Sequence, residues 1–304
     1  MLLPSEGSVT VQPVETRVLP EFTLDEKELR RAAARRPIKR IAGRLLYQSN
    51  LYTRLWRGRA LIAVFHRIDD RYPTNSITCS TRQFREFCDF FTRYFRVVSL
   101  TELLDRLTAG ADISRRLAIT FDDGYRDNFT FAAAELRKRG LPATFFVTTG
   151  FIGTEHTAWW DAGEGIRSEW MTWSEVRRLQ EQGFDLGCHT ATHADCGQIS
   201  LPEALLEIVG AKSRLESEIN APVRHFAFPY GSPMRMTEEN RAIVQEAGFA
   251  CCLSAHGGVV SVSDSPFRLC RVPINTWYTS PYQFAFEAAR MVSKGPARLA
   301  QQGE

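Results

Sequence analysis

"AITFDDGYRDN", residues Ala118–Asn128, places two adjacent aspartates directly after an apolar run and before a turn-forming glycine. Two carboxylates this close repel each other, and each loses hydration where a buried strand ends. A helix N-cap would account for one of them, since Asp is a favoured capping residue. The second carboxylate needs another partner, which is a bound cation or a shared proton.

The apolar run before these aspartates belongs to a regular alternation along the chain. Short apolar segments predict strands at 60–66, 116–121, 142–149, 184–190, 225–230, 249–254 and 269–274. Segments with helical periodicity lie between and around them, at 81–95, 127–140, 172–183, 201–219, 237–248 and 281–292. This alternation is typical of parallel β/α units. Six or seven units within about 230 residues favour a closed or nearly closed α/β barrel over an open sheet.

The charge distribution sets the segment before this barrel apart. Residues 27–59 hold eleven Lys or Arg side chains against Glu28 alone, although the whole chain has a net charge of +3. Apolar residues recur there at about helical spacing, namely Ile41, Leu45, Tyr52, Leu55 and Trp56. Two interpretations remain open, an amphipathic helix on an anionic membrane surface or a solvated helix packed on the catalytic domain. Nucleic acid is not an expected partner, because the rest of the chain is acidic and shows no aromatic stacking platform.

Composition and termini bound the class of protein. The chain has 304 residues, 44% apolar and 24% charged, as in soluble globular proteins. We find neither a membrane-spanning apolar run nor the basic and apolar regions of a secretory signal. Seven cysteines in mostly apolar contexts predict buried free thiols, so we expect a cytoplasmic location with a membrane-surface association as an option.

The domain organisation follows from these patterns. We expect a flexible N-terminal tail at 1–26, a basic amphipathic helical arm at 27–58, the catalytic barrel at 59–293 and a C-terminal tail at 294–304.

Three further motifs follow predicted strands. His189 and His193 in "CHTATH" are four residues apart, a spacing that lets two imidazoles bind one metal, although two loop histidines are the alternative. "HFAFPYG", residues 225–231, predicts a packed turn or one that aims the Tyr230 N–H into the barrel mouth. His66 in "VFHRID" ends the first predicted strand, where a structural histidine is the alternative.

Taken together, the motifs favour a catalytic metal site. All lie at C-terminal ends of predicted parallel strands, which meet at one rim of a barrel. One carboxylate and two imidazoles form a three-ligand site with open positions. The other aspartate then stands unligated beside the metal, where a general base acts. The sequence offers no Gly-rich phosphate loop, G-x-S-x-G elbow or C-x-x-C pair for a competing chemistry.

"TFDDGY", "H-T-x-x-H" and "FAFPYG", in this order, resemble the polysaccharide deacetylases of carbohydrate esterase family 4, whose domain is called the NodB-homology domain. The resemblance spans about Arg59–Ile274. It implies a distorted (β/α)7-type barrel, one divalent metal, usually Zn²⁺, and hydrolysis of N-acetyl groups from an amino-sugar glycan.

The resemblance also implies a role for each motif residue. Asp123, His189 and His193 become the metal ligands, and Asp122 becomes the general base. The turn at Tyr230 supplies a backbone N–H to the oxyanion hole. The tryptophans that could stack on a sugar are Trp159, Trp160 and Trp173, although a structural role is the alternative for Trp173, which stands at a predicted helix start after Thr172.

Two departures from the family pattern decide the remaining roles. The chain has no leucine–x–histidine motif near its C-terminus, and His66 stands ahead of the first motif instead. That order resembles the circularly permuted subgroup acting on poly-N-acetylglucosamine-type exopolysaccharides, and makes His66 the general acid. Ala227 stands where the third motif usually carries an arginine that pairs with the base. Arg271 in "LCRVPI" could replace that arginine, with Arg224 as the alternative.

Two other functions stay open. One is a metal-dependent hydrolase of a non-sugar linear or cyclic amide on the same scaffold. The other is a sugar-binding module without turnover, against which the complete set of acids and histidines argues. The glycan itself could be an exopolysaccharide, a lipid-linked precursor, peptidoglycan or a chitin-like oligomer.

Overall fold

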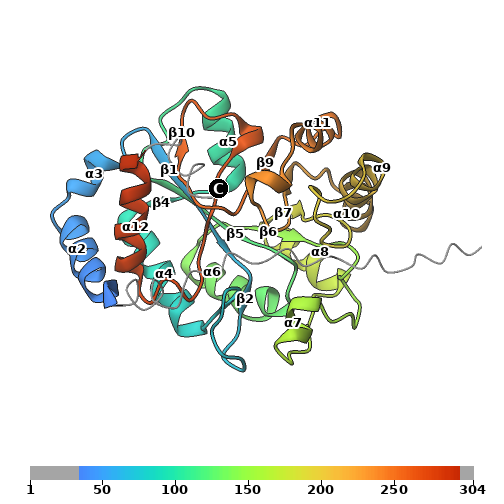
Figure 1. Ribbon diagram of the computed structural model, residues 1–304, viewed down its shortest axis with the longest axis horizontal. Coiled ribbons are helices and arrows are strands. Elements are labelled where there is room, and N and C mark those ends of the chain that lie inside the picture. The colour runs from blue at the N-terminus through green and yellow to red at the C-terminus, as the bar shows by residue number, and fades with distance from the viewer. Residues whose placement is uncertain (1–33, 295–304) are drawn as a thin grey trace, which may run out of the picture. The chain divides into compact units, whose positions relative to one another are not determined.

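A curled, mostly parallel sheet forms the centre of the protein, and helices lie around it (Figure 1). The computed structural model describes residues 34–294, and the chain from Pro37 onward belongs to one compact unit. The nine-stranded sheet has the order β10-β1-β5-β6-β7-β8-β9, with β11 paired to β1 and β4 paired to β5. Its strands are β1 (Arg59–Phe65), β4 (Arg96–Val97), β5 (Arg116–Phe121), β6 (Thr144–Val147), β7 (Asp185–Cys188), β8 (His225–Ala227), β9 (Cys251–Leu253), β10 (Val260–Ser261) and β11 (Val272–Pro273). A separate two-stranded sheet contains β2 (Arg67–Ile68) and β3 (Thr78–Cys79).

The strand pairing explains why the sheet curls into a barrel. Strands β1, β5, β6, β7, β8 and β9 pair in parallel in this order, and β11 also pairs in parallel with β1, whereas β10 pairs with β1 in the antiparallel direction. A parallel bridge between Leu253 of β9 and Leu269, which precedes β11, links the two ends of the sheet. These closing contacts involve few residue pairs, so the barrel is distorted between β9 and β11. The predicted α/β fold, a distorted (β/α)7-type barrel, is confirmed.

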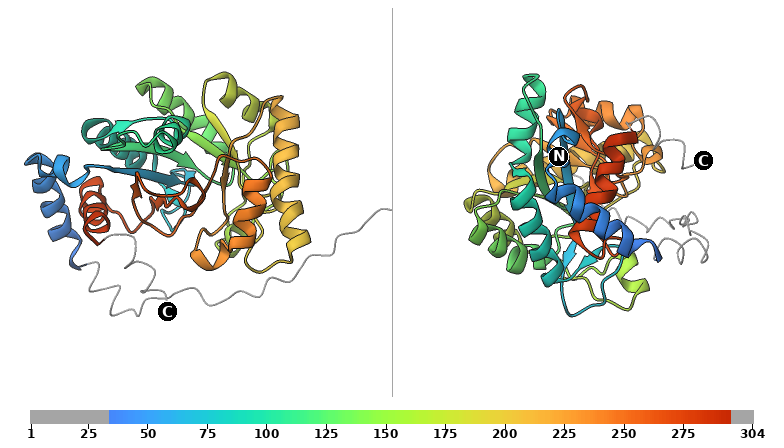
Figure 2. Two further views of the ribbon diagram at one scale, coloured as in Figure 1. Left: turned by 90° about the horizontal axis from the view of Figure 1, so that it is seen from above. Right: turned by 90° about the vertical axis from the view of Figure 1, so that its left-hand side faces the viewer.

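Helices connect the strands and cover the outer face of the sheet (Figure 2). They are α2 (Arg36–Gln48), α3 (Leu51–Leu55), α4 (Thr81–Tyr94), α5 (Leu100–Thr108), α6 (Ala134–Arg139), α7 (Trp159–Gly163), α8 (Trp173–Glu181), α9 (Leu201–Leu205), α10 (Ala211–Ile219), α11 (Glu238–Glu246) and α12 (Pro281–Lys294). A π-helical turn at Leu206–Gly210 joins α9 to α10, so the helix predicted at 201–219 has a widened middle. The short helices α5 and α7 have no counterpart among the predicted helices.

Helix α4 shows how local sequence and packing agree. Ser80 caps its N-terminus, since the Ser80 hydroxyl accepts a hydrogen bond from the Gln83 N–H. Phe84, Phe87 and Phe91 recur at helical spacing and are completely buried against the sheet. Burying an aromatic or aliphatic side chain of this size contributes about 1.5–3 kcal/mol, so this face fixes α4 on the barrel.

The alternation of side chains along β5 prepares the position of the paired aspartates. Leu117, Ile119 and Phe121 point to the layer between the sheet and the helices, whereas Ala118 belongs to the cluster inside the barrel. Side chains alternate between the two faces of a strand. The next inward position beyond the strand end is therefore that of Asp122, at the mouth of the barrel.

Within residues 37–58, the basic arm packs onto the barrel through aromatic side chains. Tyr47, Tyr52 and Trp56 are buried, and the Trp56 Nε1–H donates to the Tyr47 hydroxyl at 2.7 Å. Gly43 lies on the same side of α2, against the backbone of α12, where a Cβ atom would lie 1.9 Å from the Tyr282 carbonyl oxygen. The arm is thus docked on one face, as the second of the two sequence interpretations proposed.

Other sequence predictions concern cysteines, bilayer-spanning segments and the ends of the chain. All seven cysteines are unpaired, and six are buried while Cys270 is partly exposed. None of the helices within residues 34–294 combines the length and apolar character that a bilayer-crossing segment needs. The predicted tail at 1–26 lies outside the described residues, as does the predicted tail beyond Lys294.

We expect Gly43→Ala to destabilise the protein by about 1–3 kcal/mol, because the added methyl group must displace α2 or α12. Gly210→Ala is the matched control, since Gly210 also has helical φ but no atom within 4 Å of the place that an added methyl group would take. There the higher helix propensity of Ala leaves stability unchanged or raises it by up to about 1 kcal/mol. Urea unfolding of both variants measures the difference, and equal stabilities would contradict the close contact.

Candidate active site

The ends of four parallel strands bring the predicted site residues to one rim of the barrel. Asp122 and Asp123 follow β5, and His66 follows β1. His189 follows β7, and the turn that contains Tyr230 comes after β8. Parallel strands present their C-terminal ends at the same side of a barrel, so residues distant in sequence meet there.

Asp123, His189 and His193 form a buried cluster whose ligand atoms all lie within 4.8 Å of one another. The Nε2 atoms of His189 and His193 are each 3.4 Å from Asp123 Oδ1. These separations are long for hydrogen bonds. They match the distance of about 3.3–3.4 Å between two ligand atoms that each lie about 2.0–2.1 Å from a tetrahedral metal. Asp123 Oδ1 is also buried with no hydrogen-bond partner within residues 34–294, so the donor set fits a divalent cation.

A backbone contact orients His189 for this role. Its Nδ1–H donates to the Ala227 carbonyl oxygen at 2.9 Å, which leaves the lone pair of Nε2 facing Asp123. Burial lowers the pKa of His193 below its ordinary value, which favours the neutral imidazole that binds metals. Burial acts in the same direction on His189, but the Asp122 charge raises its pKa overall, so a proton and a metal compete for His189.

Three site residues have backbone conformations that are uncommon for side-chain-bearing residues. Asp123 has φ 73°, and His193 and Tyr230 each have φ 61°. Such conformations typically cost about 1–3 kcal/mol and persist only where the surroundings enforce them. The strain turns the side chains after β5, β7 and β8 towards one point, and no sequence pattern predicted it.

Asp122 has a different partner from Asp123. Its two oxygens each accept a hydrogen bond of 2.6 Å from the guanidinium of Arg271, which is completely buried. Burial alone would raise the pKa of Asp122, but the charge of Arg271 outweighs it and holds that pKa below the usual range. The nearest Asp122 oxygen lies 3.8 Å from His189 Nε2, so the ionised carboxylate stands beside the metal-type cluster.

The structure also decides between the two arginines considered for this pairing. Arg271 crosses the barrel interior, where its Nε donates to the Ser254 carbonyl oxygen at 2.7 Å and its Nη1 lies 3.3 Å from Thr120 Oγ1. Arg224 is half-exposed at the opposite end of β8, and its nearest carboxylate is Asp105 at 3.8 Å. Arg224 therefore does not reach the aspartates, and Arg271 is the arginine that pairs with Asp122.

His66 lies next to the aspartate pair because of the strand register. Phe65 of β1 is paired with Phe121 of β5, and the Asp122 N–H donates to the Phe65 carbonyl oxygen at 3.0 Å. His66 Nδ1 is buried without a hydrogen-bond partner in the part of the chain described. After burial, the largest influences on the lowered pKa of Asp122 are Arg271 and His189. The site thus holds an imidazole close to the predicted base.

Aromatic side chains wall the cluster on one side. The ring centroids of Trp160 and Tyr230 are 4.5 Å and 4.9 Å from that of His193. The Tyr230 N–H has no acceptor within residues 34–294, so it is free to donate to a substrate oxygen. Trp159 is 53% exposed next to Trp160, whereas Trp173 lies under the guanidinium of Arg214.

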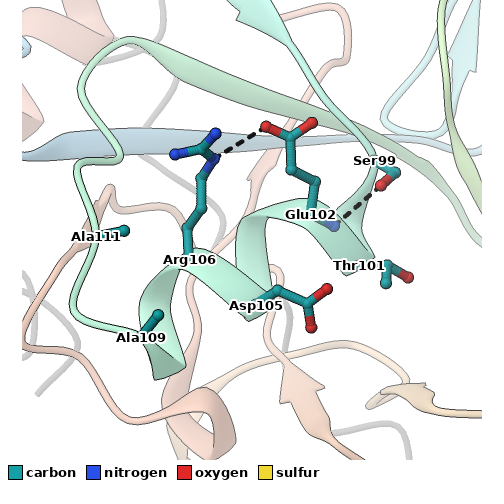
Figure 3. A pocket seen from close by; sticks show the side chains of 7 residues that line it. All are labelled: Ser99, Thr101, Glu102, Asp105, Arg106, Ala109 and Ala111. Carbon is teal, nitrogen blue, oxygen red and sulfur yellow. Dashed lines mark hydrogen bonds and ion pairs between the residues drawn. The ribbon is translucent and has the colours of Figure 1, made fainter.

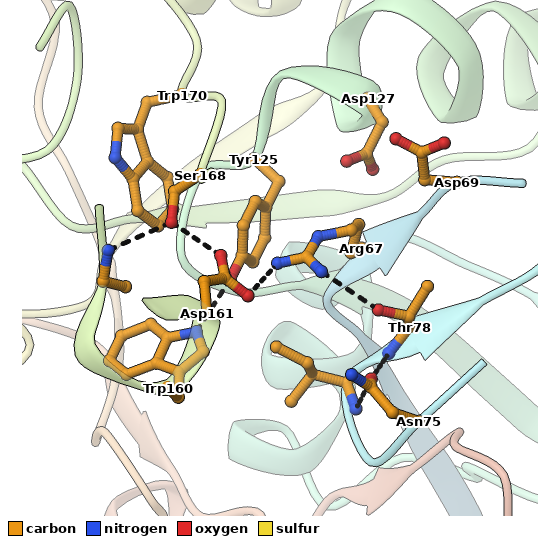
Figure 4. A network of polar contacts seen from close by, with 12 residues as sticks. Arg67, Asp69, Asn75, Thr78, Tyr125, Asp127, Trp160, Asp161, Ser168 and Trp170 are labelled. Carbon is orange, nitrogen blue, oxygen red and sulfur yellow. Dashed lines mark hydrogen bonds and ion pairs between the residues drawn. The ribbon is translucent and has the colours of Figure 1, made fainter. Parts of the chain in front are cut away.

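A buried polar network behind this wall was not found from the sequence (Figure 4). Arg67 forms an ion pair with Asp161, and both side chains are almost completely buried. Asp161 also accepts a hydrogen bond of 2.9 Å from the Tyr125 hydroxyl, which in turn accepts one of 2.8 Å from Trp160 Nε1. The network therefore fixes the ring that packs on His193. The one hint of this network in the sequence was that two of its members stand next to predicted site residues: Arg67 follows His66, and Tyr125 belongs to "TFDDGY".

A surface depression along α5 is unrelated to this site (Figure 3). Its lining residues are Ser99, Thr101, Glu102, Asp105, Arg106, Ala109 and Ala111. Glu102 and Arg106 pair with each other across one helical turn at 3.0 Å. The depression contains none of the strand-end residues, so the rim remains the candidate active site.

Comparisons with known proteins agree with this geometry. The family model described as polysaccharide deacetylase matches residues 109–252. The match covers a little under half of the chain, so this segment is similar to polysaccharide deacetylases. The matched segment includes the aspartate pair, both cluster histidines and the Tyr230 turn, but reaches neither His66 nor Arg271.

Two curated relatives each match part of this chain. It is 24% identical over 157 residues to the putative polysaccharide deacetylase YxkH of Bacillus subtilis, a match to 52% of this chain and 50% of that relative. It is 27% identical over 114 residues to a bifunctional xylanase/deacetylase of Pseudobutyrivibrio xylanivorans, covering 38% of this chain and 16% of that protein. The chain spans half the length of the first relative, and less of the second.

Solved structures share the fold. IcaB from Ammonifex degensii superposes with a TM-score of 0.63 at 22% identity, covering 75% of this chain and 96% of that chain. The Streptococcus pyogenes deacetylase PplD, solved in complex with acetate, gives a TM-score of 0.61 at 19% identity and covers 74% of this chain and 96% of that chain. At these identities the likeness establishes the barrel architecture.

One partly buried carboxyl near the rim gives the protein a pH-dependent stability. Asp127 accepts hydrogen bonds from the Ile68 N–H at 2.7 Å and from Asn128 Nδ2 at 2.9 Å, and burial raises its pKa to about 7. The folded state therefore binds this proton more tightly than the unfolded state. Stability is lost as the pH rises from about 4 to about 7, by at most about 1.4 kcal/mol per pH unit.

We expect Asp127→Asn to remove this loss, because the neutral amide still accepts the Ile68 N–H and never ionises. Relative to the parent, the variant should gain melting temperature at pH 8 and little at pH 5. Glu181→Gln is the control, since Glu181 is exposed and has no ion pair within residues 34–294. An identical pH profile for the parent and Asp127→Asn would mean that Asp127 is ionised throughout.

Proposed function

We propose that this protein is a metal-dependent deacetylase that hydrolyses N-acetyl groups of an amino-sugar glycan, either a GlcNAc-containing polysaccharide or a lipid-linked precursor. The observation that carries the proposal is that the two adjacent aspartates have different partners. Asp122 is engaged by Arg271, while Asp123 faces two imidazoles. The polysaccharide deacetylase family model and the curated relative give independent support.

The proposed reaction needs one cation and one base. Asp123, His189 and His193 would hold a divalent cation, Zn²⁺ by the family resemblance, which supplies a water of lowered pKa and polarises the amide carbonyl. Asp122 takes the proton of the attacking water. Arg271 keeps that carboxylate ionised and oriented, since both guanidinium contacts are 2.6 Å long.

The remaining proposed roles concern charge and the leaving group. The Tyr230 N–H donates to the oxygen that becomes negative as the amide is attacked, and one such donor contributes about 3 kcal/mol. His66, as the general acid, gives a proton to the departing sugar nitrogen. The products are acetate and a free amino group on the glycan. Trp160 and Trp159 offer apolar surface for the sugar beside the cluster.

The finer assignments rest on sequence order and charge. The position of His66 ahead of the aspartate motif supports the subgroup that acts on poly-N-acetylglucosamine-type exopolysaccharides. The proposed partners are an acetylated glycan or glycolipid and, through residues 27–58, an anionic membrane surface. The proposed location is cytoplasmic with peripheral membrane association, which agrees with seven unpaired cysteines.

An acetate-release assay tests the function as a whole. The protein is incubated with N-acetylated oligosaccharides of the poly-N-acetylglucosamine, chitin and peptidoglycan types, with and without a chelator. We expect acetate from at least one oligosaccharide, loss of release with the chelator and recovery with Zn²⁺. Hydrolysis of small linear or cyclic amides without any acetate release from sugars would favour the non-sugar amide hydrolase instead.

Asp122→Asn tests the proposed base. We expect turnover to fall at least about a hundredfold while one metal per chain is retained by elemental analysis. The variant should also melt earlier, because Arg271 loses its buried counter-charge. His189→Ala is the comparison, since it should lose the metal as well as the activity. Full activity of Asp122→Asn would remove the base from the proposal.

His66→Gln tests the proposed acid separately from the metal. His66 belongs to no part of the Asp123 cluster, so metal content should be unchanged while the rate falls by about 10²–10⁴. An unchanged rate would return His66 to a structural role.

A further inference from the structure

Helix α2 has a second apolar face that points away from the barrel. Ile38, Ile41 and Leu45 are 68%, 59% and 62% exposed. Successive residues of a helix are about 100° apart, so these three lie on one stripe, opposite the side that carries Gly43 and Tyr47. The right-hand view of Figure 2 looks onto this side of the protein, with α2 in front and α12 beside it. Packing on the barrel therefore accounts for only one face of α2.

Positive charge accompanies the exposed stripe. On α2, Arg44 and Arg40 lie on one flank of the stripe, about 60° and about 100° around the helix from Ile41. Arg54 lies on α3 and Arg57 follows α3, and all four arginines are exposed. None of the four has an ion-pair partner among residues 34–294. The sequence around them also carries no negative side chain, since no acidic residue occurs from position 29 to position 68.

A second exposed apolar group on the same protein gives an internal comparison. It consists of Leu201, Leu205, Leu206 and Val209 on α9 and the turn after it. Leu206 is 73% exposed, so exposure alone does not distinguish it from the α2 stripe. The charge of the two groups differs, because Glu203 and Glu207 lie within the α9 group and no Lys or Arg occurs between positions 201 and 211. Of these two apolar groups, the α2 face is the one that combines exposed aliphatic side chains with arginines that lack an ion-pair partner in the described chain.

We infer that the outward face of α2 is a docking surface for an anionic lipid bilayer. Ile38, Ile41 and Leu45 enter the boundary between headgroups and acyl chains, and Arg40 and Arg44 contact the lipid phosphates. A helix that lies flat on the membrane must be fixed to the rest of the protein by its other side. The buried aromatic face of α2 meets that requirement, so the barrel is held at the membrane by a rigid contact.

A second copy of the chain fits this face less well. A two-fold symmetric contact places the same patch against itself, so Arg40 and Arg44 of both copies would approach each other. No acidic side chain from positions 29–68 is present to balance them. An anionic surface satisfies the same charges, and its attraction weakens as salt screens it.

Vesicle flotation with the full chain tests the docking surface. We compare vesicles of phosphatidylcholine alone with vesicles that also contain phosphatidylglycerol. We expect binding to the anionic vesicles only, reduced by added salt. The double variant Ile41→Ser/Leu45→Ser and the double variant Arg40→Gln/Arg44→Gln should each weaken binding at least about tenfold.

Leu205→Ser/Leu206→Ser is the matched control and should bind like the parent. The four α2 positions are exposed, so melting temperatures of the variants should match that of the parent. Acetate release from soluble oligosaccharides should also be unchanged in the α2 variants, which separates this inference from the proposed catalysis. Absence of vesicle binding by the parent overturns the inference. So does binding that survives both α2 variants, or a dimer in light scattering that the α2 variants dissociate.

Discussion

The buried ion pair between Arg271 and Asp122 governs the chemistry of the rim. Both side chains are almost completely withdrawn from water, so each charge would be very costly without the other. With its two oxygens occupied by one guanidinium, Asp122 stays ionised while lying beside the histidine cluster. Asp123 is then the carboxylate left for the imidazole cluster. Two chemically identical neighbours acquire different environments through a single arginine.

That arginine depends on the way the barrel closes. Arg271 immediately precedes β11, a two-residue strand that pairs with β1 and completes the ring of parallel strands. Its side chain runs through the interior and also binds the carbonyl oxygen of Ser254. One of the shortest strands of the sheet thus directly follows the counter-charge of the proposed base. Because Arg271 leads into the strand that closes the sheet, closing the sheet also brings the positive charge that keeps Asp122 ionised.

Around this pair, the rim is held by strained backbone and by a second buried charge pair. Asp123, His193 and Tyr230 adopt left-handed backbone conformations that only dense packing maintains. Arg67 and Asp161 anchor the hydrogen-bonded chain that ends at Trp160. Rigid support of this kind limits the freedom of groups that must act on one substrate atom.

The sequence by itself determined the elements whose signal is local. Apolar periodicity located the main strands and most helices, and the strand-end motifs identified Asp122, Asp123, His189, His193, His66 and Tyr230 as neighbours at one rim. Local patterns also left real ambiguities, such as Arg271 against Arg224 and a docked against a membrane-bound arm. Neither choice can be made from local sequence, because each depends on which groups meet in space.

Only the tertiary structure resolved what depends on distance through space. It separates Arg224 from the aspartates, because the two ends of β8 lie at opposite ends of the barrel. It joins Arg67, Asp161 and Tyr125, which no spacing relates. It also gives α2 two faces with different surroundings, since burial depends on which elements pack against a helix. Periodicity specifies which residues share a face, whereas partners for that face come from the whole chain.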